Sequence, residues 1–249
     1  MAHRFYKLKG KIHYRLKARH HHGFGIHSPY LFHLITSVLQ EQYPYYYFGG
    51  IESLRKELYI KPVSFGRKKF VTRHSYKKDA RCGQIIFRII EDAQFGTLLE
   101  LGTSTGLETQ YMALANQKAR CISVTKSAEL AAKARNGFQK QGLNHIELEV
   151  LRPDETTDSV LNNLKTLDFV LFNKLSGAQE SLETFNKCLP KKNDGSIFVF
   201  MNIHGNPNMA EAWKKIRAHH EVQATIDLYD LGIALFKPEL EKINYVIRT

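Results

Sequence analysis

The sequence of 249 residues has few cysteines, no long apolar run and, at its start, no acidic residue. Its three cysteines, Cys82, Cys121 and Cys188, are far apart and form no CxxC pair. This usage argues against a disulfide framework or a zinc site and favours a reducing compartment. No apolar run approaches the ~18–20 residues that a membrane span requires. The basic amino terminus lacks the apolar core of a secretory signal, so we expect a cytoplasmic protein.

Charge is distributed unevenly along the chain, and the first acidic residue is Glu41. Residues 1–95 carry 18 Lys and Arg against 6 Asp and Glu, and they account for the whole net charge of +12. The remainder is electrically balanced. This asymmetry predicts a basic, aromatic-rich N-terminal cap segment over residues 1–82 and an α/β domain over residues 83–249.

Two stretches of the cap, residues 4–19 and 61–81, are especially basic. They could bind nucleic acid, an anionic membrane surface or an acidic small molecule, or they could be solvated surface. Residues 28–40 have apolar residues at helical spacing after a Ser-Pro start, which predicts a helix. A second helix is expected from Ile51, and a third over residues 83–93.

Aromatic residues are concentrated in the run QYPYYYF of the cap, and they are Tyr43, Tyr45, Tyr46, Tyr47 and Phe48. Such side chains could stack on bases or on an aromatic acceptor. They could equally form the apolar contact between the cap and the larger domain. We expect at least half of them to make that contact.

From residue 97 onward, short apolar runs alternate with amphipathic stretches. The apolar runs predict strands at 97–101, 121–124, 145–151, 167–172 and 196–201. The stretches between and after them predict helices at 106–117, 127–142, 154–164, 177–189 and 209–220. Strands separated by helices imply parallel pairing. The runs VQATIDLY and LGIALFK predict a terminal antiparallel hairpin, and INYVIRT could add an edge. We therefore expect a doubly wound, mostly parallel, seven-stranded α/β sheet.

The loop LLELGTSTG (98–106) follows the first expected strand and precedes a helix. Ligands of open parallel sheets bind beyond the carboxyl ends of the strands. Gly102 and Gly106 permit positive φ and close backbone approach there. Glu100 ends the strand, and we expect its carboxylate to point toward that crevice. A Gly-x-x-x-Gly spacing alone is also typical of a purely structural turn, but the strand before it and the helix after it favour a ligand loop.

With these motifs, residues 83–237 resemble the class I S-adenosylmethionine-dependent methyltransferases. They are most similar to the small O-methyltransferase branch with catechol and caffeoyl-CoA members. The resemblance is carried by ELGTSTG, AELAAKARNGFQKQGL, LDFVLFN, the helix ending in CLP, and SIFVFMN. It implies a Rossmann-like domain with S-adenosylmethionine as cofactor. It places four residues of the first loop beside the methionine part of that cofactor: Glu100, Gly102, Ser104 and Gly106. Thr103, between them, is also a predicted cofactor-binding residue.

The chain departs from the family pattern at several acidic positions. Thr125 stands where the family normally has an acid that binds the ribose hydroxyls. The absence of that carboxylate would weaken cofactor binding by ~1–3 kcal/mol. The catechol-type members bind their metal with two Asp residues and one Asn. Asn173 and Met201 stand at the two Asp positions, and of the three ligands only the Asn is kept, as Asn202. Because Mg²⁺ prefers carboxylate oxygens, the resemblance predicts no metal centre of that type. Thr125 and Asn173 are predicted cofactor-binding residues.

The catalytic base is the least defined part of the sequence. His204 follows the fifth strand and Lys174 follows the fourth, so both are candidates at the ligand-binding edge, although each could be an ordinary loop residue. Further histidines occur in the cap: His20, His21, His22, His27 and His33. No Cys or carboxylate lies near the HHH run, which favours a solvated arm over a metal site, but one of them could act as a base.

Three functions fit these features. The first is metal-independent O-methyl transfer from S-adenosylmethionine to a small acceptor, with catalysis resting on alignment of the reactants. The second, suggested by Thr125, Asn173 and Met201, is a catalytically degenerate binding or scaffold protein. The third is a nucleic-acid-binding methyltransferase that uses the basic cap. Against the third, LFNKLS after the fourth strand lacks the N/D-PP-Y/F tetrapeptide of amino-methylating enzymes.

Overall fold

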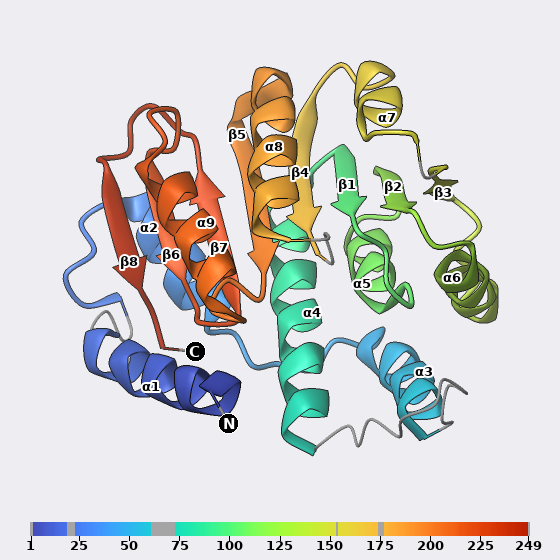
Figure 1. Ribbon diagram of the computed structural model, residues 1–249, viewed down its shortest axis with the longest axis horizontal. Coiled ribbons are helices and arrows are strands. Elements are labelled where there is room, and N and C mark those ends of the chain that lie inside the picture. Colours follow the sequence, from blue (N-terminus) through green and yellow to red (C-terminus); the bar gives the residue numbers. More distant parts are fainter. Residues whose placement is uncertain (1, 19–22, 61–72, 153, 174–176, 249) are drawn as a thin grey trace.

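The computed structural model describes residues 2–18, 23–60, 73–152, 154–173 and 177–248. Within these ranges one sheet has eight strands in the order β3-β2-β1-β4-β5-β7-β6-β8 (Figure 1). The strands are β1 (Thr97–Leu101), β2 (Arg120–Thr125), β3 (Ile146–Val150), β4 (Leu167–Phe172), β5 (Lys192–Met201), β6 (Ala224–Asp227), β7 (Leu231–Leu235) and β8 (Ile243–Val246). The first five pair in parallel, and β7 is antiparallel to both β5 and β6. The predicted doubly wound sheet with an antiparallel hairpin is confirmed.

The sheet has one strand more than the seven expected. The segment INYVIRT supplies β8, which pairs in parallel with β6 and forms the edge of the sheet. Only Tyr245 of its four residues is buried, so its apolar signal in the sequence is weak.

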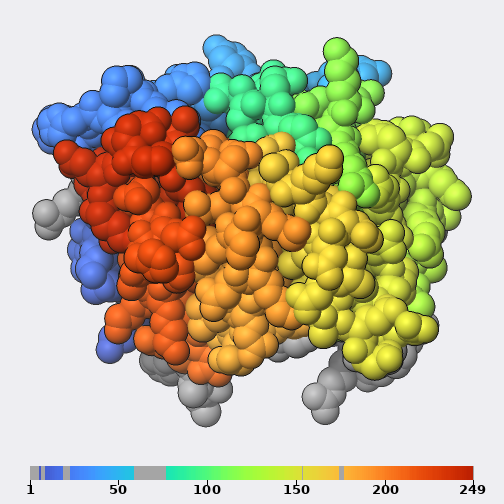
Figure 2. All heavy atoms as spheres, turned by 90° about the horizontal axis from the view of Figure 1, so that it is seen from above, coloured from blue at the N-terminus to red at the C-terminus, as the bar shows by residue number. Residues whose placement is uncertain are grey.

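Helices cover the sheet on both faces, as alternation of side chains along buried strands requires. One face packs against α4 (Arg73–Ala93), α5 (Leu107–Ala115) and α6 (Ala128–Lys140). The other packs against α7 (Asp158–Asn162), α8 (Ala178–Cys188), the 3₁₀ turn η3 (Leu189–Lys191) and α9 (Pro207–Ala218). Seen from above, the blue-to-green part of the chain lies along one side of the molecule and the yellow-to-orange part along the other (Figure 2). No helix within the described ranges is long and apolar enough to cross a membrane.

The cap segment is helical and shares its apolar core with the sheet. Its elements are α1 (Ala2–Lys17), α2 (Pro29–His33), the π-helical turn η2 (Leu34–Leu39) and α3 (Phe48–Ile60). The helix predicted over residues 28–40 is thus formed by α2 and η2, and its Ser28 hydroxyl caps it by accepting from the Leu31 N–H at 3.4 Å. One apolar cluster contains side chains of η2, α4 and the sheet. Helix α4 runs through the junction expected between residues 82 and 83.

Three of the five rings of the aromatic run in the cap lie against α4. The rings of Tyr45 and Phe48 pack on Phe87 of α4, with centroids 4.8 and 5.1 Å apart. Tyr43 and Tyr46 are 77% and 94% exposed, and Tyr47 is also exposed. Phe48 is buried and Tyr45 is partly buried, whereas Tyr47 stays exposed although its ring centroid lies 6.3 Å from that of Phe87. The expectation that at least half of these rings contact the larger domain therefore agrees with the structure.

The turn after β1 depends on two glycines with positive φ, Gly102 at 96° and Gly106 at 78°. A Cβ atom on Gly106 would lie 2.7 Å from Phe138 Cε1 and 2.8 Å from the Ala134 Cβ of α6. Gly106 therefore permits both the left-handed backbone and the close packing of α6 on the start of α5.

We expect Gly106→Ala to destabilise the protein by about 1–3 kcal/mol more than Gly142→Ala, because of overpacking against α6. Gly142 also has a positive φ of 68°, but no atom lies within 4 Å of its ideal Cβ position. It is therefore a matched control for backbone strain alone. Chemical denaturation measures both variants; equal losses would show that packing at position 106 is unimportant.

Candidate functional site

The carboxyl ends of β1, β2 and β4 meet at one edge of the sheet, at the lower ends of these strands in Figure 1. Leu101 pairs with Val124 on one side and with Phe172 on the other. Beyond the strands, the N–H groups of Gly102 and Thr103 both donate to the Val124 carbonyl, at 2.9 and 2.8 Å. These bonds hold the first loop against the end of β2.

A cavity of about 250 Å³ lies at this edge. Three of the predicted cofactor-binding residues line it: Gly102, Thr103 and Thr125. The other lining residues, which the sequence analysis did not select, are Leu101, Val124, Lys126, Ser127, Leu130, Leu151, Thr157 and Glu180. The cavity thus combines an aliphatic wall with hydroxyl groups and backbone of the glycine loop. Its volume approaches the lower end of the range typical of small-molecule sites, about 300–1,000 Å³.

Glu100 does not line this cavity, in contrast to the expectation from the sequence. Its side chain is fully buried on the α5 side of the sheet. One carboxylate oxygen accepts from Thr109 Oγ1 at 2.5 Å and Ser123 Oγ at 2.6 Å, and the other accepts from Asn173 Nδ2 at 2.9 Å. Burial raises the pKa of this carboxyl group, the nearby Glu108 raises it further, and the three hydrogen bonds oppose the shift. Glu100 therefore connects β1, α5, β2 and the end of β4.

The remaining predicted cofactor residues also lie beside the cavity rather than in its wall. Ser104 is buried in the turn, and Gly106 contacts α6 as described above. Asn173 is half-buried, and its side-chain amide donates to Glu100.

The structure describes one of the two candidate bases, His204. Lys174 is outside the described residues, as are His20, His21 and His22. His204 Nε2 lies 2.7 Å from Oδ2 of the buried Asp227, and its ring stacks on Tyr229. His204 lines a separate cavity of about 440 Å³ beside α1. Because Asp227 belongs to β6, four strands from β1, this histidine lies roughly 19 Å along the sheet from the glycine loop.

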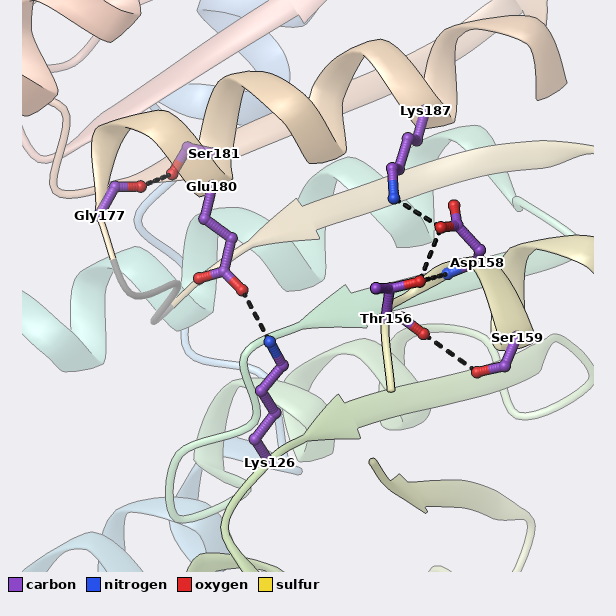
Figure 3. Close-up of polar contacts among 8 residues, drawn as sticks. All are labelled: Lys126, Thr156, Asp158, Ser159, Gly177, Glu180, Ser181 and Lys187. Carbon is purple, nitrogen blue, oxygen red and sulfur yellow. Dashed lines mark hydrogen bonds and ion pairs between the residues drawn. The ribbon is translucent and has the colours of Figure 1, made fainter. Parts of the chain in front are cut away.

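An ion pair crosses the edge of the 250 Å³ cavity. Lys126 Nζ, just after β2, lies 3.3 Å from Glu180 Oε1 in the first turn of α8 (Figure 3). Neither residue was among those predicted from the sequence. The available signal was that both residues follow strands that end at the same edge.

The loop after β3 is fixed by local polar contacts. Asp158 Oδ2 accepts from the Thr156 hydroxyl at 2.6 Å and pairs with Lys187 of α8 at 2.6 Å (Figure 3). The Ser159 hydroxyl donates to the Thr156 carbonyl at 3.1 Å. These contacts position Thr157 in the cavity wall and explain why α7 starts at Asp158, later than the helix predicted from residue 154.

The positions that correspond to a catechol-type metal centre do not fit Mg²⁺. Asn173 is oriented by Glu100, and Met201 offers only a thioether. The Asn202 amide oxygen accepts from Lys78 Nζ at 3.4 Å. A lysine ammonium at this oxygen opposes the approach of a second cation.

Comparison with known proteins supports the fold. No family model matches the sequence, and no curated protein matches it either. Solved structures do match. The O-methyltransferase TomG from Streptomyces achromogenes, in complex with S-adenosylmethionine, has a TM-score of 0.55 and 15% identity over 78% of this chain and 91% of TomG. The chain has the fold of an O-methyltransferase.

Two further structures agree with this assignment. An O-methyltransferase from Bacillus cereus, in complex with S-adenosylhomocysteine, has a TM-score of 0.55 and 14% identity over 82% of this chain and 95% of its own. The S-adenosylhomocysteine-bound methyltransferase PaMTH1 from Podospora anserina has a TM-score of 0.59 and 10% identity, covering 85% of this chain and 97% of its own. The fold implied by the sequence resemblance is confirmed.

We expect the free energy of unfolding of Glu100→Gln to rise relative to that of the wild type as pH increases from about 4.5 to 7. Because the folded-state pKa of Glu100 is raised above its ordinary value of 4.5, the folded protein holds this proton more strongly than the unfolded chain. The stability of the wild type therefore falls as pH rises from about 4.5 through the folded-state pKa. The uncharged amide avoids this loss, so the variant gains stability relative to the wild type with rising pH, on top of a pH-independent difference from its altered hydrogen bonds with Thr109, Ser123 and Asn173.

Glu147→Gln is the control of opposite sign, because Arg120 lowers the pKa of Glu147. Its effect should be a loss of stability at neutral pH that disappears in acid. Urea denaturation at several pH values measures both variants. A stability difference between Glu100→Gln and the wild type that does not change with pH would contradict the raised pKa of Glu100.

We further expect no stoichiometric Mg²⁺ binding with a dissociation constant below about 1 mM, because the donor set lacks carboxylates. Calorimetric titration with MgCl₂ measures this directly. Tight one-to-one binding that Asn173→Ala abolishes would show that the site at this edge is a metal centre.

Proposed function

We propose that the protein is an S-adenosylmethionine-dependent methyltransferase that methylates a small, oxygen-bearing acceptor without a metal ion. The observation that carries this proposal is the cavity beside the glycine loop at the carboxyl ends of β1 and β2. It lies where ligands of doubly wound sheets bind. The TomG structure contains S-adenosylmethionine and the PaMTH1 structure contains S-adenosylhomocysteine, which supports the same cofactor here.

The residues of the cavity fit the parts of such a cofactor. The backbone of Gly102 and Thr103 would contact its amino-acid portion, and Leu130 and Leu151 offer apolar surface to a purine. Thr125 Oγ1 accepts from the Ser127 N–H at 3.2 Å, so the hydroxyl proton can be donated to a ribose oxygen.

Glu180 would supply the carboxylate that the end of β2 lacks. It lines the same cavity as Thr125, and Lys126 holds one of its oxygens. A carboxylate accepts several hydrogen bonds, so Glu180 can accept from ribose hydroxyls while it keeps its contact with Lys126. The acid is thus provided by α8 instead of β2.

The bound cofactor would supply a methyl group on a sulfonium, which is already activated for transfer. The contribution of the chain is then to exclude water and to align the acceptor oxygen. Lys174 and His204 stay the predicted bases. For His204 to act, the acceptor must extend from the β1–β4 edge to the cavity beside α1. We propose a cytoplasmic location, in keeping with the buried thiols of Cys82, Cys121 and Cys188.

A scaffold function is the second candidate. It is favoured by one specific observation: Glu100, the acid of the glycine loop, is occupied by Thr109, Ser123 and Asn173. The nucleic-acid alternative rests on the basic residues of α1, whereas most of the second basic stretch, residues 61–72, is outside the described residues.

The proposal predicts that the protein binds S-adenosylmethionine and S-adenosylhomocysteine, measured by calorimetry. Glu180→Gln should weaken both by about 5–30-fold, which corresponds to a lost charged hydrogen bond of ~1–2 kcal/mol. Glu183→Gln should have no effect, because Glu183 lies on the same helix but is exposed and accepts from Gln179. Absence of heat at millimolar ligand would favour the scaffold function instead.

A further inference from the structure

A third, partly open cavity lies between α1, α4 and the turn that joins β6 to β7, and it shares Tyr14 with the neighbouring cavity that His204 lines. It is a cavity of about 270 Å³. Its wall has an aromatic and apolar part formed by Tyr14, Ile85, Leu228 and Tyr229. The rings of Tyr14 and Tyr229 contact each other with centroids 5.2 Å apart. The Tyr14 hydroxyl donates to the Ile247 carbonyl, which fixes α1 against the end of β8.

The polar part of this wall is strongly basic. Five cationic side chains from three separate segments converge there: Lys11, Arg15, Lys78, Arg81 and Arg248. Among the described lining residues Asp230 is the one carboxylate, and it pairs with Lys78 at 2.7 Å. The lining groups therefore carry a formal net charge of +4.

The other titratable groups of the wall do not offset this charge at neutral pH. Burial raises the pKa of the Cys82 thiol and of the Tyr14 phenol, and it raises the pKa of Tyr229 to about 12. All three are therefore uncharged. The Lys11 ammonium lies over the Tyr229 ring, 5.9 Å from its centroid, which provides only a weak cation–π attraction.

Clustered cations repel one another, and a cavity with low-dielectric walls concentrates their potential. An anion that enters such a hollow removes this repulsion and gains charge-assisted hydrogen bonds. Guanidinium groups are particularly suited to phosphate, because their planar donors match two phosphate oxygens at once.

We propose that this cavity binds a small phosphomonoester, with Arg15, Arg81 and Arg248 contacting the phosphate and the Tyr14–Tyr229 wall contacting the organic part. A charge of +4 suits a dianion better than a single carboxylate. The concave arrangement favours a small molecule over a nucleic-acid strand, which needs an extended basic surface.

This inference does not depend on the proposed methyltransferase activity. The phosphate cavity shares no lining residue with the cavity that contains Gly102 and Thr125. It lies near the ends of β6, β7 and β8, beyond β4 and β5 from the glycine loop. Titration with S-adenosylhomocysteine on the same samples therefore reports on the other site separately.

Calorimetric titration of the full chain with phenyl phosphate tests the inference. The expected result is one-to-one binding with a dissociation constant below about 1 mM. Arg81→Gln and Arg248→Gln should each weaken it by at least 5-fold, since each removes a charged hydrogen bond. Lys118→Gln is the matched control, because Lys118 is an exposed cation in the loop between α5 and β2 and should leave the affinity unchanged. Thermal melting of each variant verifies that it is folded.

Three outcomes would overturn the inference. The first is no binding of phenyl phosphate at 10 mM, and the second is equal affinity in the wild type and both arginine variants. The third is binding of phosphatidic-acid vesicles or of a single-stranded RNA oligonucleotide without binding of the soluble ester, since the basic wall would then serve a lipid headgroup or a polymer. Unaltered binding of S-adenosylhomocysteine in the arginine variants would confirm that the two cavities are independent.

Discussion

The buried carboxylate of Glu100 is the interaction on which the rest of the ligand edge depends. A carboxylate without solvent contact must be hydrogen-bonded, because an unsatisfied buried charge is very costly. Three side chains donate hydrogen bonds to this carboxylate: Thr109 on α5, Ser123 on β2 and Asn173 at the end of β4. Three segments that are distant in sequence are thereby fixed around the first loop. The same requirement keeps Glu100 out of the neighbouring cavity.

This arrangement separates two tasks at the glycine loop. Gly106 and Glu100 determine how the loop packs on α5 and α6, whereas Gly102, Thr103 and Thr125 form the accessible surface. A negative charge for a ligand must then come from another element, and Glu180 at the start of α8 is the carboxylate in the cavity wall. In our interpretation, Glu180 on α8 compensates for the acid that is missing at Thr125, at the end of β2.

The sequence predicted the layered sheet well because buried parallel strands are continuous apolar runs, as LDFVLF illustrates. It was less informative at the edge strand β8, where Tyr245 alone is buried. The cavity wall was predicted in part, since residues adjacent to a strand end, such as Gly102 and Thr125, follow from topology. Side-chain direction did not follow: whether Glu100 points into the crevice or toward α5 depends on which hydroxyls lie nearby. Pairs such as Lys126 and Glu180, which are distant in the chain, leave no periodic signal.

Part of the excess positive charge of residues 1–95 lines the phosphate cavity. Helix α1 contributes Lys11 and Arg15, and it is fixed to the sheet through Tyr14. When α1 packs on the sheet, these cations come close to Lys78, Arg81 and Arg248, and the repulsion between the like charges opposes this packing. The contact between the Tyr14 and Tyr229 rings favours it. A bound dianion reverses the electrostatic contribution, because each cation is then attracted to the same centre. By linkage, a ligand that binds only the docked arrangement stabilises it. The position of α1 and occupancy of the phosphate cavity are then coupled, and the basic cap becomes a ligand-dependent part of the fold.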